Sequence, residues 1–302
     1  MNGRAAVADV ELPDVGELDR SPFERRALRN LLLTAGIWLA AVIASVPLFS
    51  VLYLLVVRGG SRLSIEALTA LPPAGFEMGG GFGNAIVGTI VMVGIAGLIS
   101  VPVGVAAAVF LAEIGPLSRL SRATRFAAKT LTGLPSVLAG VFAYAAVVLT
   151  TGSYSAPAGG LALAVLMVPI VVLTAEEAIR AVPRITRDAA YGMGCTRMQV
   201  AWKVLLPTAL PGILTGVMLA VARAAGETAP LLFTALFSSY WLFEGGQARL
   251  MQPTASLAVL IYNFSGMPFE NQIELAWAAS LVLVLMVLVI NVVSRLIGRP
   301  RV

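Results

Sequence analysis

Residues 188–207 read DAAYGMGCTRMQVAWKVLLP and contain two short segments with helical spacing around a pair of glycines. Asp188-Ala189-Ala190 offers a helix start with small side chains, and Gly192 and Gly194 provide a sharp turn. The second segment is amphipathic, and we expect Pro207 to end it. A helix, a glycine turn and a second helix can insert into the groove of a partner protein. The same pattern is also compatible with an ordinary loop on a membrane surface.

The rest of the chain has the composition of a membrane protein. Of its 302 residues, 58% are hydrophobic and 12% are charged, and the mean hydropathy is +0.90. A soluble domain is about 25% charged. Only residues 1–30 differ, because they combine many charges with few large apolar side chains. We expect them to form a disordered cytoplasmic tail.

The scarcity of histidine and cysteine excludes several kinds of chemistry. The chain has no histidine and a single cysteine, Cys195. Histidine-based proton relays, Ser-His or Cys-His nucleophile pairs and cysteine-cluster metal sites are therefore excluded. We expect no catalytic residue, no metal site and no cofactor in this chain.

Six stretches are apolar over about the 20 residues that a helix needs to cross a bilayer. They are residues 31–57, 85–111, 126–149, 161–179, 208–237 and 275–297. The sequence therefore predicts an all-α polytopic membrane protein with six transmembrane helices. Residues 31–82 would form the first helix and an extracytoplasmic loop.

Lys and Arg residues gather on one side of these six spans. The exceptions among the 21 are Arg58, Arg62, Arg223 and Arg249. Because cytoplasmic loops are enriched in Lys and Arg, we expect both termini in the cytoplasm. The same distribution accounts for a pI near 9.8 without a nucleic-acid-binding face.

The stretch ARAAGETAP, residues 222–230, places Arg223 and Glu227 inside the fifth expected span. With 1.5 Å of rise per residue, Arg223 would lie about 20 Å from either end of that helix. An Arg at the centre of a membrane helix costs about 2.5–3.5 kcal/mol. An ion pair with Glu227, four residues on, often fails to recover the desolvation cost. We therefore expect a polar path between helices beside the pair.

An oxyanion suits such a path, because a guanidinium presents forked donors and stays charged when partly buried. Glu227 would orient Arg223, and Thr228 would add a hydroxyl. Ser136 could add another, although a helix-packing serine is the commoner case. The alternative for Arg223 and Glu227 is an ion pair that locks two helices together.

Three other acidic residues lie near the ends of expected spans. Glu176 and Glu177 close the fourth span beside Arg180 and Arg184, and Glu113 lies at the end of the second. We expect ion pairs at the membrane interface for these residues rather than a ligand-binding role.

Residues 188–207 resemble the EAA loop of the permease subunits of ABC importers. That motif is E-A-A, three residues, G, nine residues and then I-x-L-P. This chain has Asp188-Ala189-Ala190, Gly194, Val204 and Leu206-Pro207 at the same spacing. Asp for Glu keeps the charge, and Val for Ile keeps the shape. The resemblance implies that this coupling loop docks on an ATPase subunit and transmits ATP-driven movement to the membrane helices.

Three further stretches resemble the PstA-type permeases of phosphate-specific ABC transporters. They are GNAIVGT at 83–89, LTGLPSVLAGVFAY at 131–144 and LAVARAAGETAPLLFTA at 219–235. The resemblance implies a type I, MetI-like ABC importer permease fold with its core at 83–298, and it places Arg223 on the phosphate path. It also implies a bacterial plasma membrane and three kinds of partner: a PstC-type permease, two ATPase subunits that use ATP and Mg, and an extracytoplasmic phosphate-binding protein.

We therefore expect a permease subunit that moves inorganic phosphate inward by alternating access. One alternative is an ABC importer permease for sulfate or molybdate, which would share the coupling loop. Another is a stand-alone secondary transporter or channel that uses Arg223 and Glu227 for gating and has no use for such a loop. A third is a membrane anchor that assembles other subunits.

Overall fold

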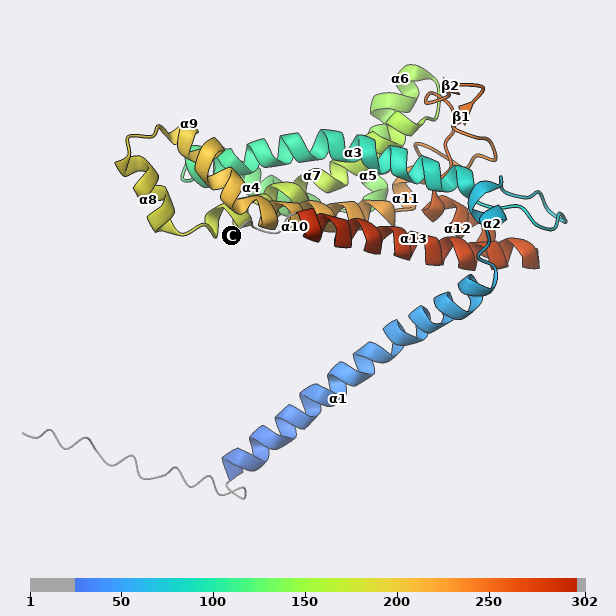
Figure 1. The fold of residues 1–302 in the computed structure, drawn as a ribbon, viewed down its shortest axis with the longest axis horizontal. Coiled ribbons are helices and arrows are strands. Elements are labelled where there is room, and N and C mark those ends of the chain that lie inside the picture. The colour runs from blue at the N-terminus through green and yellow to red at the C-terminus, as the bar shows by residue number, and fades with distance from the viewer. Residues whose placement is uncertain (1–24, 298–302) are drawn as a thin grey trace, which may run out of the picture. The chain divides into compact units, whose positions relative to one another are not determined.

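The computed structural model describes residues 25–297, and nearly all regular structure in this part of the chain is helical (Figure 1). The chain divides into two units, Met1–Tyr53 and Leu54–Val302. The first unit contains α1 (Arg25–Leu54), an apolar helix of 30 residues, except for its last residue. Of the tail expected at 1–30, residues 1–24 lie outside the described residues, and residues 25–30 form the start of α1.

The second unit contains the other elements, in which η denotes a π-helical turn. Its first half comprises η1 (Leu55–Gly59), α2 (Ile65–Thr69), α3 (Gly83–Val109), η2 (Phe110–Ile114), α4 (Arg119–Thr132), α5 (Ser136–Ala143), η3 (Tyr144–Val148) and α6 (Leu149–Thr151). Its second half comprises α7 (Ala156–Arg180), α8 (Arg184–Gly192), α9 (Arg197–Gln199), η4 (Val200–Leu205), α10 (Leu206–Ala225), α11 (Ala229–Leu232), β1 (Phe243–Glu244), β2 (Gln247–Ala248), α12 (Leu257–Ser265) and α13 (Glu270–Ile297). The two short strands pair antiparallel.

Five continuous helices in the described part of the chain are long and apolar enough to cross a membrane. They are Leu28–Gly59, Gly83–Ile114, Ala156–Arg180, Arg197–Ala225 and Glu270–Ser294. The remaining expected span, at 126–149, is not one straight helix, because Arg119–Thr132 and Ser136–Thr151 meet at an angle of 106°. Pro135 explains the break: the residue before a proline is disfavoured in helical geometry, and Pro135 itself has an extended ψ of 129°. Six spans result when the bent pair counts as one.

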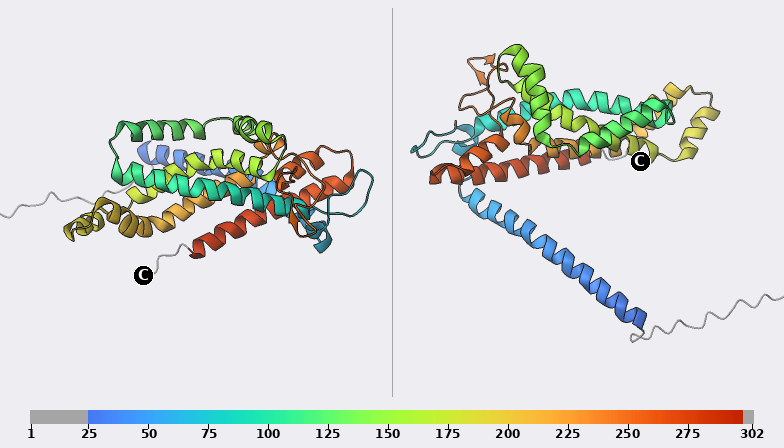
Figure 2. Two further views of the ribbon diagram at one scale, coloured as in Figure 1. Left: turned by 90° about the horizontal axis from the view of Figure 1, so that it is seen from above. Right: turned by 180° about the vertical axis from the view of Figure 1, so that it is seen from behind.

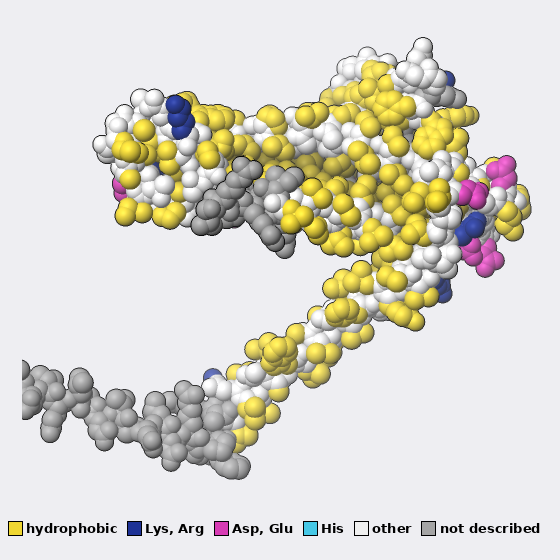
Figure 3. Space-filling model, in the orientation of Figure 1, with side chains coloured by type: hydrophobic (Ala, Val, Ile, Leu, Met, Phe, Trp, Pro, Cys, Tyr) yellow, Lys and Arg dark blue, Asp and Glu magenta, His cyan; other side chains and the backbone are white. Residues whose placement is uncertain are grey.

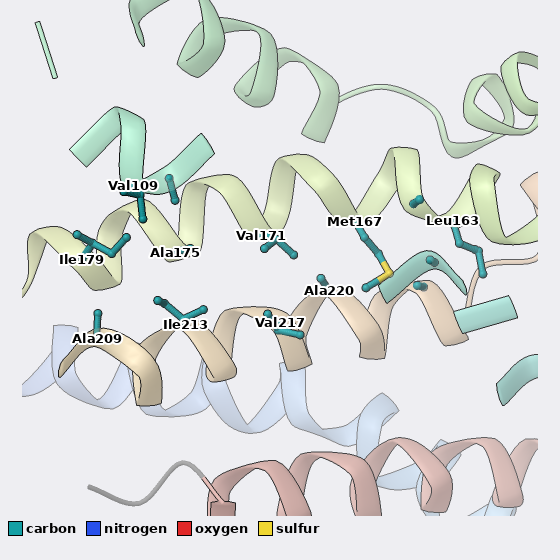
Figure 4. Packing of buried hydrophobic residues seen from close by; sticks show 14 of the residues in the cluster. Val109, Leu163, Met167, Val171, Ala175, Ile179, Ala209, Ile213, Val217 and Ala220 are labelled. Atoms are coloured by element: carbon teal, nitrogen blue, oxygen red, sulfur yellow. The ribbon is translucent and has the colours of Figure 1, made fainter. Parts of the chain in front are cut away.

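Helix α7 lies at the centre of the second unit and packs against α3, α4, α5 and α10. Figures 1 and 2 show α3, α7, α10 and α13 running roughly along one direction. Apolar side chains of α7 fill the space towards α3 and α10 (Figure 4). Close approach of these helices depends on small residues: a Cβ at Gly104 of α3 would lie 2.6 Å from a methyl carbon of Val171.

The two ends of the second unit carry most of its charged side chains, and apolar side chains cover the stretch between them (Figure 3). At the end with α2, a second core contains residues from α2, α3, α12 and α13, among them Ala67, Phe82, Leu260 and Leu275. The opposite end carries α8 and α9. An apolar band between two polar ends is the arrangement that a bilayer requires of a spanning protein.

A glycine in α3 gives a test of this packing. A Cβ at Gly88 would overlap the backbone carbonyl oxygen of Ala255. We expect Gly88→Leu to lower the free energy of unfolding by about 1–3 kcal/mol, because overpacking forces a backbone shift. The apparent melting temperature of the detergent-purified protein measures this effect. Gly94→Leu is the matched control, since nothing lies within 4 Å of its Cβ position. Equal melting temperatures for the two variants would contradict the packing described here.

Candidate functional site

Helix α10 ends at Ala225, and not near residue 237 as the sequence predicts. Gly226 is its C-cap, and α11 begins at Ala229. Pro230 accounts for the interruption, because it has no N–H and its ring would clash with the carbonyl of Gly226, four residues back. Arg223 therefore lies in the last turn of α10, so the expected helix length of about 20 Å exists on its N-terminal side and is wrong on its C-terminal side. The C-terminal end of a helix is favourable for a cation, which reduces the cost of placing Arg223 there.

Arg223 and Glu227 lie beside each other at this interruption. Nε of Arg223 is 3.4 Å from Oε1 of Glu227, near the upper limit for a hydrogen bond. The Arg223 side chain is 43% exposed and that of Glu227 is 16% exposed. The terminal nitrogens of Arg223 have no hydrogen-bond partner among the residues that the structure describes. The pair is thus loose, and the guanidinium keeps donors available for an anion.

Thr228 lies within the interruption between α10 and α11, whereas Ser136 begins a helix that packs on α11. Thr228 is the N-cap residue of α11, but its hydroxyl makes no capping hydrogen bond. Ser136 begins α5, whose Gly140 packs on α11: a Cβ at Gly140 would lie 2.6 Å from Cα of Pro230. Within residues 25–297, the structure gives Ser136 no hydrogen bond to Arg223 or Glu227. Ser136 therefore belongs to the helix that supports α11.

A groove of about 640 Å³ runs along α10 and reaches Ala222, the residue before Arg223. It is lined by Thr174, Glu177, Ala178, Ala181, Gly212, Thr215, Gly216, Leu219, Ala222 and Asn291. Thr215, Leu219 and Arg223 are four residues apart and exposed, so they share one face of α10. Most of this lining is apolar, and Thr174, Glu177, Thr215 and Asn291 add polar groups along the helix that carries Arg223.

The polar residues that line this groove were not predicted from the sequence. A single Thr or Asn in a membrane helix is usually a packing residue, and only the spacing of Thr215 from Arg223 was a usable signal. The expected ion pairing is found for Glu176, which contacts Arg125 at 2.7 Å and Arg180 at 2.8 Å. Glu177 has no ion pair within the described residues and lines the groove instead.

Residues 188–207 contain the expected helix, turn and second helix, but the helix boundaries differ from the prediction. Helix α8 begins at Arg184, after Pro183, so Asp188-Ala189-Ala190 lies inside it and not at its start. Asp188 and Ala189 are exposed, whereas Ala190 is buried. Gly194 provides the expected turn, with a φ of +82° that L side chains rarely adopt.

Pro207 does not end the segment that follows. The helix continues without a break from Arg197 to Ala225. Pro207 falls in the first turn of α10, directly after the π-helical turn η4, where a missing N–H is tolerated. Leu206 and Pro207 therefore join the coupling loop to the helix that carries Arg223. Movement of the loop can reach Arg223 along one continuous helix.

Glu113 forms the expected ion pair at the end of α3 and its continuation η2. Its Oε2 lies 3.0 Å from Nε of Arg187, and the Tyr191 hydroxyl donates to its Oε1. Burial of the phenol, followed by the hydrogen bond and the negative charge of Glu113, raises the pKa of Tyr191. Within the described residues, no group of three or more His, Cys, Asp and Glu side chains could hold a metal ion.

Solved structures of transport proteins share this fold. A bacterial alginate ABC transporter, solved with an alginate-bound periplasmic protein, matches 92% of this chain and 97% of its own at 16% identity, with a TM-score of 0.62. The MetNI methionine ABC transporter in an inward-facing form matches 72% of this chain and 92% of its own at 22% identity, with a TM-score of 0.55. The fold is therefore that of a type I ABC importer permease, a multi-pass membrane subunit.

Sequence comparisons narrow this class. Residues 100–299 match the family model described as binding-protein-dependent transport system inner membrane component. The phosphate transport system permease protein PstA of Pasteurella multocida is 37% identical over 92% of this chain and 98% of its own length. PstA of Haemophilus influenzae is 39% identical over 91% and 95%. The chain belongs to the binding-protein-dependent transport permeases and, within them, to the PstA-type permeases.

Proposed function

We propose that this chain forms half of the translocation path of an ATP-driven importer of inorganic phosphate. The observation that carries the proposal is the exposed guanidinium of Arg223, which has free donors and directly follows Ala222, a residue that lines the groove along α10. Guanidinium donors match the oxygens of a tetrahedral anion. The names of the PstA relatives support phosphate as that anion.

In this proposal both termini and α8 are cytoplasmic, and α2 lies on the extracytoplasmic side of a bacterial plasma membrane. A PstC-type permease completes the path opposite α10. Two ATPase subunits bind and hydrolyse ATP with Mg, so this chain needs no catalytic residue. A phosphate-binding protein delivers the anion from outside, and membrane lipid surrounds the apolar band.

The surface around α8 and η4 suits an ATPase partner. Ile185 is 77% exposed, Met193 is 78% exposed and Trp202 is 50% exposed. Large apolar side chains exposed at a charged end of the protein mark an interaction surface. Arg184, Arg197 and Lys203 surround them and add positive charge.

The geometry suggests how an anion passes Arg223 without being trapped. The Arg223 guanidinium binds the phosphate oxygens, while the nearby Glu227 carboxylate partly offsets its charge and keeps binding weak enough for release. Farther along the groove, the carboxylate of Glu177 repels an anion. Among the described residues that line the groove, none is a cation that would hold phosphate on its way to the cytoplasm.

Uptake of radiolabelled phosphate into vesicles tests this proposal. The chain is reconstituted with its co-purified partners, and ATP is enclosed on the ATPase side. We expect ATP-dependent uptake that excess unlabelled phosphate blocks and excess sulfate does not. No uptake of phosphate, together with ATP-dependent uptake of radiolabelled sulfate or molybdate, would identify a different oxyanion. Uptake by the chain alone without ATP would identify a secondary transporter.

The turn at Gly194 provides a test of the docking role. Its φ of +82° costs a residue with a Cβ about 1–3 kcal/mol. We expect Gly194→Val to reorient residues 195–199 and to reduce co-purification of the ATPase by about tenfold, which corresponds to 1.4 kcal/mol. Gly192→Val is the control, because Gly192 is helical and nothing lies near its Cβ position. Equal ATPase recovery with both variants would count against docking through this turn.

A further inference from the structure

Two residues of α8, one helical turn apart, hold the carboxylate of Glu113. Arg187 forms the 3.0 Å ion pair, and Tyr191 donates a hydrogen bond from its hydroxyl. The Glu113 side chain is only 6% exposed, and that of Arg187 is 22% exposed. One carboxylate at the end of η2 therefore fixes the helix that contains Asp188-Ala189-Ala190.

Separating Glu113 from Arg187 is unfavourable, because the Arg187 guanidinium has few other polar partners. Nε and Nη2 of Arg187 are buried and make no well-aligned hydrogen bond, so the nearby Glu113 charge is what offsets the guanidinium. Removing one partner of a buried ion pair leaves an uncompensated charge, which is strongly unfavourable. The Tyr191 phenol is protonated at neutral pH and can donate this hydrogen bond, and its pKa is raised further by burial and by Glu113. When α8 moves, η2 is therefore expected to move with it.

Helix α3 and η2 carry such a movement to the opposite end of the second unit. They form one continuous helix from Gly83 to Ile114, 32 residues and about 48 Å long. Near its other end, the buried Asn84 donates from Nδ2 to the carbonyl oxygens of Ser238 at 2.8 Å and Tyr240 at 3.2 Å. These carbonyls belong to the loop that follows α11. The helix is thus attached to α8 at one end and to this loop at the other.

We propose that Glu113 is a positioning residue that couples α8 to α3, and through Asn84 to the loop at Ser238–Tyr240. This route is separate from the direct one along α10 that passes Leu206 and Pro207. One displacement of α8 would then act on α10, before the break at Arg223 and Glu227, and on the loop at Ser238–Tyr240, after it. The inference rests on the proposed function only in that an ATPase subunit moves α8.

The test measures the accessibility of the loop at Ser238–Tyr240 while ATP acts on the ATPase subunits at the opposite end of the protein. The assembled transporter carries Cys195→Ser and Ser239→Cys, and the rate of maleimide labelling at position 239 is measured with and without ATP. We expect ATP to change this rate in the otherwise unmodified complex. Glu113→Gln and Arg187→Gln should reduce the change about tenfold, within the usual range of coupling between sites. Arg122→Gln, at an exposed arginine of α4, should leave it unchanged.

A charge exchange separates coupling from misfolding. Glu113→Arg combined with Arg187→Glu should restore most of the ATP-dependent change, because the ion pair is re-formed with opposite polarity. A full response in both single variants would overturn the proposal. Loss of ATPase co-purification in the single variants would overturn it too, since Glu113 would then support docking and not transmission. The labelling assay contains no phosphate. Its outcome therefore does not depend on whether the chain imports phosphate or another anion.

Discussion

Arg223→Gln is expected to reduce ATP-dependent phosphate uptake by about 100-fold while membrane insertion and ATPase association stay normal. Hydrogen bonds to a charged group are worth about 1.5–3 kcal/mol, and the upper value corresponds to that factor. Glutamine keeps much of the length of the side chain but removes its charge and its forked donors. Initial rates of uptake into vesicles, at equal amounts of assembled complex, measure the effect.

Because Arg223 is exposed, a loss of protein stability would not explain this result. The side chain is 43% exposed and makes one loose contact, to Glu227, so its removal should change the melting temperature little. Arg223→Lys should retain part of the activity, because lysine keeps the charge without the fork. Arg122→Gln makes the same chemical change at an exposed site outside the groove and should transport normally. Normal uptake by Arg223→Gln would favour the anchor or helix-locking alternatives.

Glu176→Gln is expected to destabilise the protein by about 3–5 kcal/mol, the cost of breaking a buried ion pair. The Glu176 side chain is 7% exposed and contacts both Arg125 and Arg180. Arg125 also donates to the carbonyl oxygens of Leu111 and Pro116, so it joins α4 and the end of η2 to α7. Neutral glutamine would leave this arginine without its charge partner. The apparent melting temperature in detergent should fall by several degrees.

Glu177→Gln is the matched control for this change. The two glutamates are neighbours in α7, but Glu177 is exposed and has no ion pair in residues 25–297. We expect its variant to melt at the temperature of the unmodified protein. If the two variants melt alike, the ion pairs of Glu176 contribute no net stability, as occurs for many ion pairs whose desolvation cost equals their attraction.

The prolines show how far sequence reasoning reaches in a membrane protein. Pro102, Pro169 and Pro211 lie inside α3, α7 and α10 without ending them. Pro135 breaks a span, and Pro230 accompanies the end of α10. The difference depends on whether neighbouring helices and local turns satisfy the freed backbone groups, which a single sequence does not show.

The site was predicted in part. The spacing of Arg223 and Glu227 indicated an ion pair beside a polar path, and the structure places the two side chains in contact near a groove. The mid-helix position of Arg223 was wrong because the α10 boundary was wrong. Thr174, Glu177 and Asn291 come from helices distant in sequence, and no local pattern connects them with Thr215.

The sequence by itself determined the membrane class, the approximate spans, the turn at Gly194 and the family, because hydropathy and motif spacing are local properties of the chain. Tertiary structure decided where helices break, which carboxylates are paired and which line a groove, and that Glu113 holds α8. Those outcomes depend on which side chains meet across helices, and packing sets that by satisfying backbone groups and buried charges together.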